Sequence, residues 1–376
     1  MICILSIISI HKYIPSLFPI SQTYGAFHYI HEMRRISQKH EQNISRFRIY
    51  TPVSEAMPQK LPGTVIVVIG ESATRDRMKA FTPSYPSETT PWLSEMKETP
   101  YFYLMDKTYS CFPVTVPALS MFLYGRNQYD HRNIDDVANI IDVAHLSGYK
   151  TWWMSNQGKM SGEDSPIDFV AQNCDMEQRT PFPLGDDYQL LDFVKQLPKN
   201  ENNFVIIHLM GSHIRYSDRT PPDFKGIDNP KHDKRTNQYD TTLLYTDHLL
   251  RDIYTYAKDH LNLQVMMYCS DHGENMERSH VASKNMTYDM VRIPFFIYLS
   301  PAYTQLYPDT AQTLRQNEHK VFTNDLMYDT ISGILHLPNT DYEPKFDLSS
   351  DTYDLKPADA RTKYGEWTIL DDPDYK

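Results

Sequence analysis

The stretch 64-TVIVVIGES-72 decides the fold of this 376-residue chain. It is a short run of β-branched residues, preceded by Pro62 and Gly63 and ended by Gly70-Glu71-Ser72. Such a continuous apolar run with turn residues on both sides is typical of a strand buried on both faces of a parallel sheet. The stretch therefore predicts a strand over residues 64–70 that carries Glu71 at its carboxyl end.

A second run, 264-QVMMYCSD-271, has the same character and delivers Asp271 and His272 from its end. Gly273 and Glu274 follow at once and cannot continue a buried strand. A carboxylate beside an imidazole suits zinc or manganese better than calcium. Taken alone, the sequence Asp-His-Gly-Glu is equally compatible with an ordinary polar loop.

Strand and helix patterns alternate along the chain, which predicts one α/β domain with a largely parallel sheet. Carboxyl ends of parallel strands meet at one sheet edge, so side chains that follow them converge there. At 376 residues with 40% hydrophobic content, the chain is long enough to bury a large core. The expected strands are 64–70, 149–155, 203–209, 264–270 and 293–299, and the expected helices are 115–124, 135–147, 187–197, 238–259 and 324–336.

Thr115 opens the segment TVPALSMFLYGR, whose apolar residues recur at helical spacing. Pro117 fits the first turn, and Thr115 is predicted to be the N-cap. Capping alone would explain a threonine here. A hydroxyl at a helix N-terminus also meets free backbone N–H groups and the positive end of the dipole, which favour an alkoxide or a phosphorylated form.

Five ordered motifs carry a family resemblance: GESATRDRM, SCFPVTVPALSMFLYGR, SNQGK, HLMGSH and SDHGE with a later histidine. Between about Pro62 and Leu337 the chain resembles the catalytic domain of the phosphoethanolamine transferases that decorate bacterial lipopolysaccharide, within the alkaline phosphatase and sulfatase superfamily. This resemblance implies a three-layer α/β/α, alkaline-phosphatase-like fold with a mostly parallel central sheet.

The resemblance also implies roles for individual residues. Glu71, Asp271 and His272 correspond to zinc ligands, together with the nucleophile Thr115. Counting ten residues back from Gly125-Arg126, as in the related sulfatases, reaches Thr115, and so does counting four forward from Cys111. Cys111 imitates the modified cysteine of sulfatases, but Val114-Thr115 replaces the Ser-Arg of their motif, so formylglycine is not expected.

The implied reaction moves phosphoethanolamine from phosphatidylethanolamine through a phospho-threonine intermediate to lipopolysaccharide, with one or two Zn²⁺ ions, or Mn²⁺, as cofactor. Charge on the phosphoryl oxygens needs donors, and His213, His280, Lys159 and Asn156 are the expected substrate-binding residues. Each also has a plainer explanation, since a lone histidine after a strand often only satisfies loop carbonyls, as we expect for His208. Glu274 is expected to orient a metal ligand.

Two other functions stay open. The chain could be a different enzyme of the superfamily, such as a phosphoglycerol transferase, a phosphodiesterase or a sulfatase. It could also be an inactive fragment, because most of the family's membrane domain has no counterpart here. The acceptor is equally open among a lipid A phosphate, a core heptose and a core phosphate.

Three regions are expected: an apolar stub and juxtamembrane linker over 1–60, the catalytic domain over 61–340, and a polar, acidic tail over 341–376 that packs loosely. The stub MICILSIISI has ten residues, about half of the ~20 needed to span a bilayer. Basic residues follow it, which would favour a cytoplasmic side. The resemblance instead implies attachment to the inner membrane, contact with the membrane surface and a catalytic domain that faces the periplasm.

A long polar, Pro-rich insertion over 217–237 follows His213 and is expected to cover the acceptor site. The formal net charge of -11 argues against nucleic acid as a partner. The four cysteines neither require nor exclude disulfides, and Cys111 and Cys174 could form one bridge in an oxidising compartment.

Overall fold

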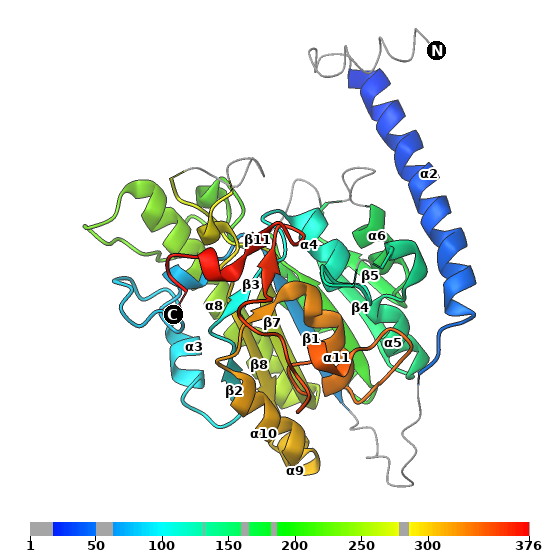
Figure 1. Ribbon diagram of the computed structural model, residues 1–376. Coiled ribbons are helices and arrows are strands. Elements are labelled where there is room, and N and C mark those ends of the chain that lie inside the picture. Colours follow the sequence, from blue (N-terminus) through cyan, green and yellow to red (C-terminus); the bar gives the residue numbers. More distant parts are fainter. Residues whose placement is uncertain are drawn as a thin grey trace.

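A seven-stranded sheet runs through the centre of the protein (Figure 1). The computed structural model describes residues 18–49, 63–130, 132–158, 165–181, 186–277 and 286–375. The strand order is β2-β8-β7-β1-β6-β4-β5, and β8 runs antiparallel to its neighbours β2 and β7. The strands of this sheet are β1 (Thr64–Gly70), β2 (Phe102–Leu104), β4 (Lys150–Ser155), β5 (Met176–Arg179), β6 (Asn203–His208), β7 (Leu263–Ser270) and β8 (Phe295–Leu299).

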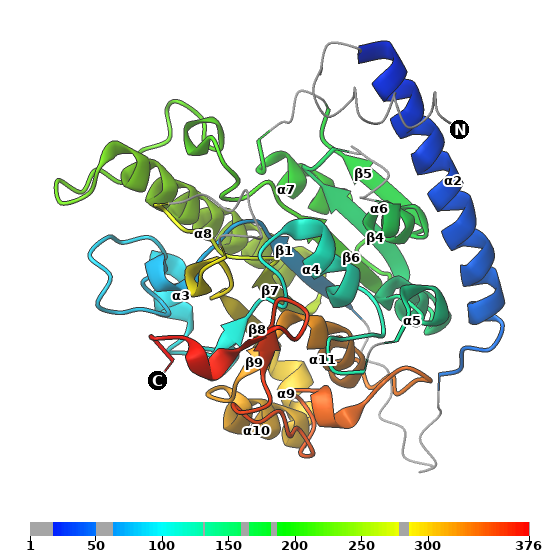
Figure 2. The same cartoon turned by 45° about the horizontal axis from the view of Figure 1, so that its top comes forward.

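Helices cover both faces of the sheet, because the side chains of each central strand alternate between two hydrophobic clusters. Val65, Val67 and Ile69 of β1 face one cluster, whereas Ile66 and Val68 face the other. The first face carries α4 (Thr115–Phe122), α5 (Ile140–Leu146), α6 (Ser165–Gln172), α9 (Pro301–Leu306), α10 (Pro308–Asn317) and α11 (Met327–Ile334). The second face carries α3 (Pro91–Met96), α7 (Gln189–Val194) and α8 (Lys234–His260). Figure 2 shows α8 and α4 on opposite sides of the sheet. The expected three-layer α/β/α fold is confirmed.

The register of the sheet aligns the ends of its central strands. Ile69 of β1 lies opposite His208 of β6, and Gly70 lies opposite Ser270 of β7. The residues that follow these positions leave the sheet at the same level, and the backbone amide of Asp271 still donates to the Gly70 carbonyl at 3.0 Å. The sheet thus brings three loops together at one edge.

Most predicted elements are present with small shifts at their ends. The strand expected over 64–70 is β1 without change, and the helix expected over 238–259 is α8 with a few residues added at its start. The helix expected over 135–147 is shorter, because Asn139 forms a capping box with Asp142 and α5 starts only at Ile140. The segment 324–336 is a 3₁₀ turn followed by α11.

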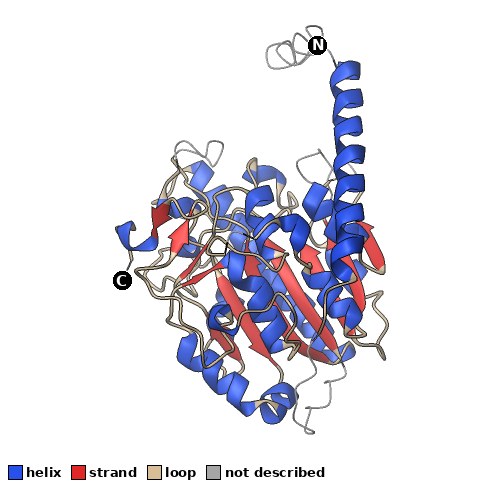
Figure 3. Ribbon diagram, turned by 45° about the vertical axis from the view of Figure 1, so that its right-hand side comes forward, coloured by secondary structure: helices blue, strands red, loops and turns tan. Residues whose placement is uncertain are grey.

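A helix that was not predicted, α2 (Phe18–Ile44), stands along one side of the body and extends beyond it (Figure 3). Its second half is held by polar contacts with the body. The ring of His40 lies 2.8 Å from the carboxylate of Asp142, and the guanidinium of Arg35 pairs with Asp135. Ile36 is buried in the same interface. Across the described ranges, no helix combines the length and the apolar character that a bilayer crossing requires.

The C-terminal segment packs firmly on the body, so the expectation of a loosely packed tail is wrong. Leu348, Ala360 and Ile369 are completely buried in the main hydrophobic cluster. The segment contains the hairpin β10 (Arg361–Thr362) and β11 (Trp367–Thr368), while β3 (Thr108–Tyr109) and β9 (Phe322–Thr323) form another small sheet. The tail was misjudged because its few apolar residues are spaced irregularly among charged ones, and only the tertiary fold shows which of them point inward.

Candidate metal centre

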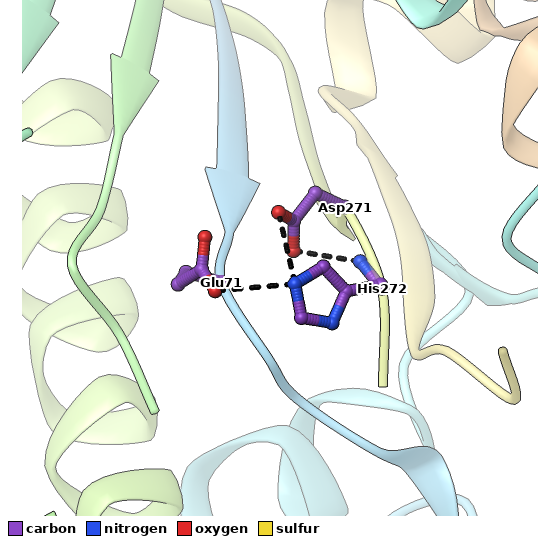
Figure 4. Close-up of side chains that lie close together, drawn as sticks. All are labelled: Glu71, Asp271 and His272. Carbon is purple, nitrogen blue, oxygen red and sulfur yellow. Dashed lines mark hydrogen bonds and ion pairs between the residues drawn. The ribbon is translucent and has the colours of Figure 1, made fainter. Parts of the chain in front are cut away.

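Glu71, Asp271 and His272 form a buried triad at the edge where β1 and β7 end (Figure 4). One possible ligand atom from each residue lies within 4.8 Å of the others. Nε2 of His272 is 3.3 Å from Oε1 of Glu71 and 3.6 Å from Oδ2 of Asp271. All three side chains are at most 1% exposed. The expected convergence of these residues is therefore present in the structure.

The triad is electrostatically coupled. Burial disfavours both carboxylates, but the neighbouring His272 holds the pKa of Glu71 well below its usual range. Burial and the charge of Glu71 raise the pKa of Asp271 to about 8. Burial lowers the basicity of His272, yet Asp271 and Glu71 outweigh it and raise the pKa of the imidazole to about 10. The protonation states of these three buried groups are therefore linked.

The donor set fits a divalent cation. Within the part of the chain that the structure describes, Oδ2 of Asp271 is buried and accepts no hydrogen bond. A buried carboxylate oxygen without a donor is costly, and a cation between the three side chains would remove that cost. Two carboxylates and one imidazole are the oxygen and nitrogen ligands that zinc and manganese accept.

Thr115 lies next to this triad, and its Oγ1 donates to Oε2 of Glu71 at 2.9 Å. The residue is the first of α4, and Val114 is the N-cap, so the predicted N-cap role of Thr115 is wrong by one position. The reason is that the hydroxyl binds Glu71 instead of a backbone amide of its own helix. A half-buried hydroxyl at the start of a helix, beside a cation site, is placed as a nucleophile requires.

Short-range contacts hold the triad in place. Ser72 adopts a left-handed conformation with φ of 55°, which allows its Oγ to donate to Oε1 of Glu71 at 2.6 Å. Its amide donates to Oδ1 of Asp271 at 3.2 Å. Nδ1 of His272 lies 2.7 Å from the carbonyl oxygen of Gly273, so this nitrogen donates to the carbonyl and Nε2 faces the carboxylates.

Gly211 lets the loop after β6 approach Glu71 closely. Its φ is +49°, and a Cβ at this position would lie 2.9 Å from the carbonyl oxygen of Glu71. The amide of Ser212 donates to the same oxygen at 2.9 Å. A side chain at Gly211 would therefore be strained by its backbone and would also push on the triad.

Two residues that the sequence reasoning missed support the site. Nε2 of Gln157 donates to Oε2 of Glu71 at 3.2 Å and to the carbonyl of Leu209 at 2.8 Å. Asp187 is buried and accepts from the amides of Met210 and Gly211 at 2.9 and 2.8 Å. Gln157 lies within the SNQGK motif, so the sequence could have predicted its place near the site. Asp187 lies in none of the motifs, and no local pattern predicts its role.

The expected substrate-binding residues have different outcomes. His213 lies at the site, half-buried, and a positive charge on it lowers the pKa of Glu71. Asn156 is buried beneath the site and donates to Asp187 at 2.7 Å, so its side chain supports the loops. Lys159 and His280 lie outside the described residues. Substrate binding by all four remains a prediction.

Two further expectations can be compared with the structure. Glu274 accepts from the hydroxyl of Tyr216 at 3.0 Å, and Nδ1 of His272 donates to the carbonyl oxygen of Gly273. That Glu274 orients a metal ligand stays a prediction. His208 is buried with its ring against Trp153, and its Nε2 makes no hydrogen bond to the residues described. The expectation that His208 satisfies a loop carbonyl is therefore wrong.

The cysteines are reduced in the described part of the chain. Cys111, Cys174 and Cys269 are free, so the bridge considered between Cys111 and Cys174 is not formed. Burial raises the pKa of the Cys111 thiol well above its usual range. A protonated, fully buried thiol is a poor nucleophile, which argues against Cys111 in that role.

An α/β sandwich with a buried carboxylate, carboxylate and imidazole triad and a threonine at the adjoining helix start defines the alkaline-phosphatase-like class of fold. The family model described as Sulfatase matches residues 63–337. The chain belongs to the sulfatase family, and the resemblance found from the motifs is confirmed.

Curated relatives carry the names of phosphoethanolamine transferases. EptC of Escherichia coli O18:K1:H7 is 26% identical over 307 residues, which cover 75% of this chain and 52% of the relative. OpgE of Escherichia coli K12 is 30% identical over 222 residues, which cover 56% and 39%. The chain thus spans about half the length of the curated relatives that it matches.

Solved structures agree on the fold. The C-terminal periplasmic domain of EptC from Escherichia coli, in complex with Zn, superposes with a TM-score of 0.73 at 23% identity. The alignment covers 87% of this chain and 96% of that domain.

Proposed function

We propose that this chain is the catalytic part of a zinc-dependent phosphoethanolamine transferase that acts on lipopolysaccharide. The observation that carries the proposal is the 2.9 Å hydrogen bond from Thr115 Oγ1 to Glu71, at the rim of a buried triad suited to a cation. Relatives with this activity in their names, and a related domain solved with zinc, support both the reaction and the metal. The acceptor would be lipid A or a core sugar.

Glu71, Asp271 and His272 would hold the metal, with Thr115 at its open side. When bound, zinc lowers the pKa of a coordinated hydroxyl and neutralises charge on phosphoryl oxygens. Glu71 accepts the hydrogen bond of the Thr115 hydroxyl, which leaves the lone pairs of Oγ1 available at the start of α4. The free amides at that helix start add donors for the phosphoryl oxygens.

In the first half-reaction, Oγ1 of Thr115 forms a bond to the phosphorus of phosphatidylethanolamine. The bond from phosphorus to the diacylglycerol oxygen breaks, and the proton that Thr115 loses ends on that oxygen. In the second half-reaction an acceptor oxygen displaces Thr115, which regains a proton. Such a double displacement retains the phosphoethanolamine group on the protein between the two steps. The half-buried His213 would stabilise the phosphoryl charge.

The same proposal includes an inner-membrane protein whose catalytic part faces the periplasm, at the membrane surface that holds its lipid donor. Support comes from the solved EptC domain, which is described as periplasmic.

The test is mass spectrometry of the intact protein after incubation with zinc and phosphatidylethanolamine. Wild type and Cys111→Ala should both gain one phosphoethanolamine, mapped to Thr115, and Thr115→Ala should gain none. Phosphatidylglycerol, supplied in a parallel sample, should give no adduct. An adduct that persists in Thr115→Ala, or one that forms only with phosphatidylglycerol, would refute the proposal.

A further inference from the structure

Arg219 is a half-buried arginine that pairs with no carboxylate among the residues that the structure describes. It follows a short 3₁₀ helix (Tyr216–Asp218) in the segment between β6 and α8, which is light green in Figure 2. Its Nε is buried and has no hydrogen-bond partner. One terminal nitrogen donates to the carbonyl of Ile214 at 3.3 Å, which is long for such a bond. Most N–H donors of this guanidinium therefore have no partner in the protein.

Other arginines that are withdrawn from water in this protein are neutralised. Arg132, Arg179 and Arg292 each form an ion pair with a carboxylate. A cation that is partly removed from water is costly unless a counter-ion meets it. Arg219 lacks that counter-ion within the described part of the chain, so an anionic ligand would remove a cost that the fold leaves in place.

The turn that carries Arg219 is fastened on both sides to the residues around the metal centre. Before the turn, the amide of Ser212 donates to the carbonyl oxygen of Glu71 at 2.9 Å. Within the turn, the hydroxyl of Tyr216 donates at 3.0 Å to Glu274, which lies just beyond the triad along the chain. The amide of Arg219 donates to the carbonyl of Tyr216 at 3.1 Å. These contacts fix the backbone of Arg219 relative to the triad before any ligand arrives.

The same turn is positively charged where it passes the triad. His213, Arg215 and Arg219 follow at short intervals, and Asp218 is the single acid among them. Arg215 has φ of 67°, so the chain bends sharply between the other two basic residues. Burial lowers the pKa of Arg219, whereas the charges of nearby carboxylates, Glu71 among them, raise it. The guanidinium thus lies within electrostatic reach of the metal centre.

The chemistry of a guanidinium selects the class of ligand. Its planar fork of N–H groups matches the oxygen atoms of a phosphate, to which it can donate two hydrogen bonds at once. Both the donor and the phospho-threonine of the proposed reaction carry a phosphate at this edge of the sheet, and one of the candidate acceptors is a phosphate as well.

We propose that Arg219 binds phosphate oxygens of a substrate beside the metal centre. The proposal rests on the proposed transferase function and adds a substrate-binding residue from the segment between β6 and α8. The phosphate belongs either to the phosphoethanolamine group of the donor or to a phosphorylated acceptor.

The test measures binding to zinc-loaded full-length protein with Thr115→Ala, from which the proposed nucleophile is removed. Phosphoethanolamine and the sugar phosphate glucosamine 1-phosphate are titrated calorimetrically, and ethanolamine and glucosamine are the matched ligands without phosphate. Adding Arg219→Gln should weaken binding of a phosphate compound about tenfold to a hundredfold, the effect of a lost charge-assisted hydrogen bond. A loss for phosphoethanolamine assigns the phosphate to the donor group, and a loss confined to the sugar phosphate assigns it to the acceptor.

Two further variants separate binding from a structural role. Arg219→Lys keeps the charge without the planar fork and should recover part of the binding. Arg251→Gln is the matched control, because it also removes one guanidinium, from an exposed ion pair on α8, and binding should stay within about twofold. Arg219→Gln should leave the melting temperature unchanged, because Arg219 has few partners in the protein.

Three results would overturn the proposal: unchanged binding of both phosphate compounds in folded Arg219→Gln, an equal loss for the compounds without phosphate, or no binding of either phosphate compound to the Thr115→Ala protein. Because Thr115 is absent from the protein that is titrated, this readout stands apart from the adduct experiment. Binding that depends on Arg219 without any adduct on wild type would refute the transfer and keep the phosphate site.

Discussion

Replacing Asp271 by asparagine should raise the stability of the metal-free protein and remove the stability that zinc adds. In the metal-free protein, burial and the charge of Glu71 raise the pKa of Asp271 from 3.8 to about 8. About four pKa units correspond to a penalty on the order of 5 kcal/mol for the ionised carboxylate. Asparagine has the same shape without the charge, so it avoids that penalty at every pH.

The sign of the pH dependence follows from the direction of each shift. A raised pKa in the fold means that the folded protein binds the proton more tightly than the unfolded chain, so stability falls as pH rises from about 4 to about 8 through Asp271. His272, with its pKa raised to about 10, causes a further loss of stability as pH rises from about 6.5 to about 10. Metal-free wild type should therefore lose stability steadily above pH 5, and Asp271→Asn should lose less.

With zinc bound, wild type should be more stable than Asp271→Asn. At 100 times its dissociation constant it stabilises wild type by about 2.7 kcal/mol, and loss of one ligand should remove most of this effect. At pH 7 both Asp271 and His272 are protonated, so zinc binding to wild type should release about two protons, measured by calorimetry in two buffers.

The assay is urea unfolding at pH 5 to 9 with a chelator or with zinc. Asp247→Asn is the control, because Asp247 is also buried and has a pKa raised to about 7 by burial, yet it caps α3 at 2.8 Å from the amide of Trp92. This variant should keep the zinc response. The reasoning fails if metal-free Asp271→Asn is less stable than wild type at pH 8, or if zinc stabilises both equally.

Three other changes test the supports of the site. Gly211→Ala should lower the free energy of unfolding by about 1 to 3 kcal/mol, because backbone strain and a close contact with Glu71 both oppose the new Cβ. Gly365 has φ of +90° and open space around a Cβ, so Gly365→Ala should lower the free energy of unfolding by less. Equal losses of stability would show that the contact at Gly211 is unimportant. Gln157→Leu should lower transferase turnover about tenfold to a hundredfold with little change in melting temperature, since it removes a donor to a metal ligand; unchanged turnover would exclude this role. Asp372→Asn should destabilise the protein by about 3 kcal/mol, because the buried Asp372 accepts a hydrogen bond from Arg292 at 2.8 Å. Asp374 is exposed, so Asp374→Asn should change the unfolding free energy by less than about 0.5 kcal/mol. Similar values for both variants would contradict a stabilising role of the buried pair.

The sequence predicted the central sheet and the triad for the same reason. A strand such as β1 is buried on both faces, so its residue pattern is nearly independent of its neighbours, and its ends are marked by glycine. Once two such strands are parallel neighbours in register, Glu71 and Asp271 must meet. Local pattern and topology were sufficient for this part of the site.

The remaining parts depend on contacts that no local pattern contains. Gln157 reaches Glu71 across 86 positions, and His40 of α2 reaches Asp142 across 102. The side of α2 that contacts the body uses ion pairs, such as those of Arg35 and His40, in place of apolar contacts. The helix therefore shows only a weak hydrophobic periodicity in the sequence. Asp187 is an ordinary aspartate in sequence and becomes important only because two loops bring their amides to it.

The link between the C-terminal segment and the start of α4 has a consequence for the order of folding. The hydroxyl of Thr362 donates to the carbonyl of Ser110, and that of Tyr364 donates to the carbonyl of Pro117, across 252 and 247 positions. Contacts of such sequence separation form only after a long loop has closed. The hydrogen bonds that hold the triad do not involve this segment. If Thr115 is the nucleophile, as proposed, docking of the segment would therefore fix the start of α4 without altering the cation site.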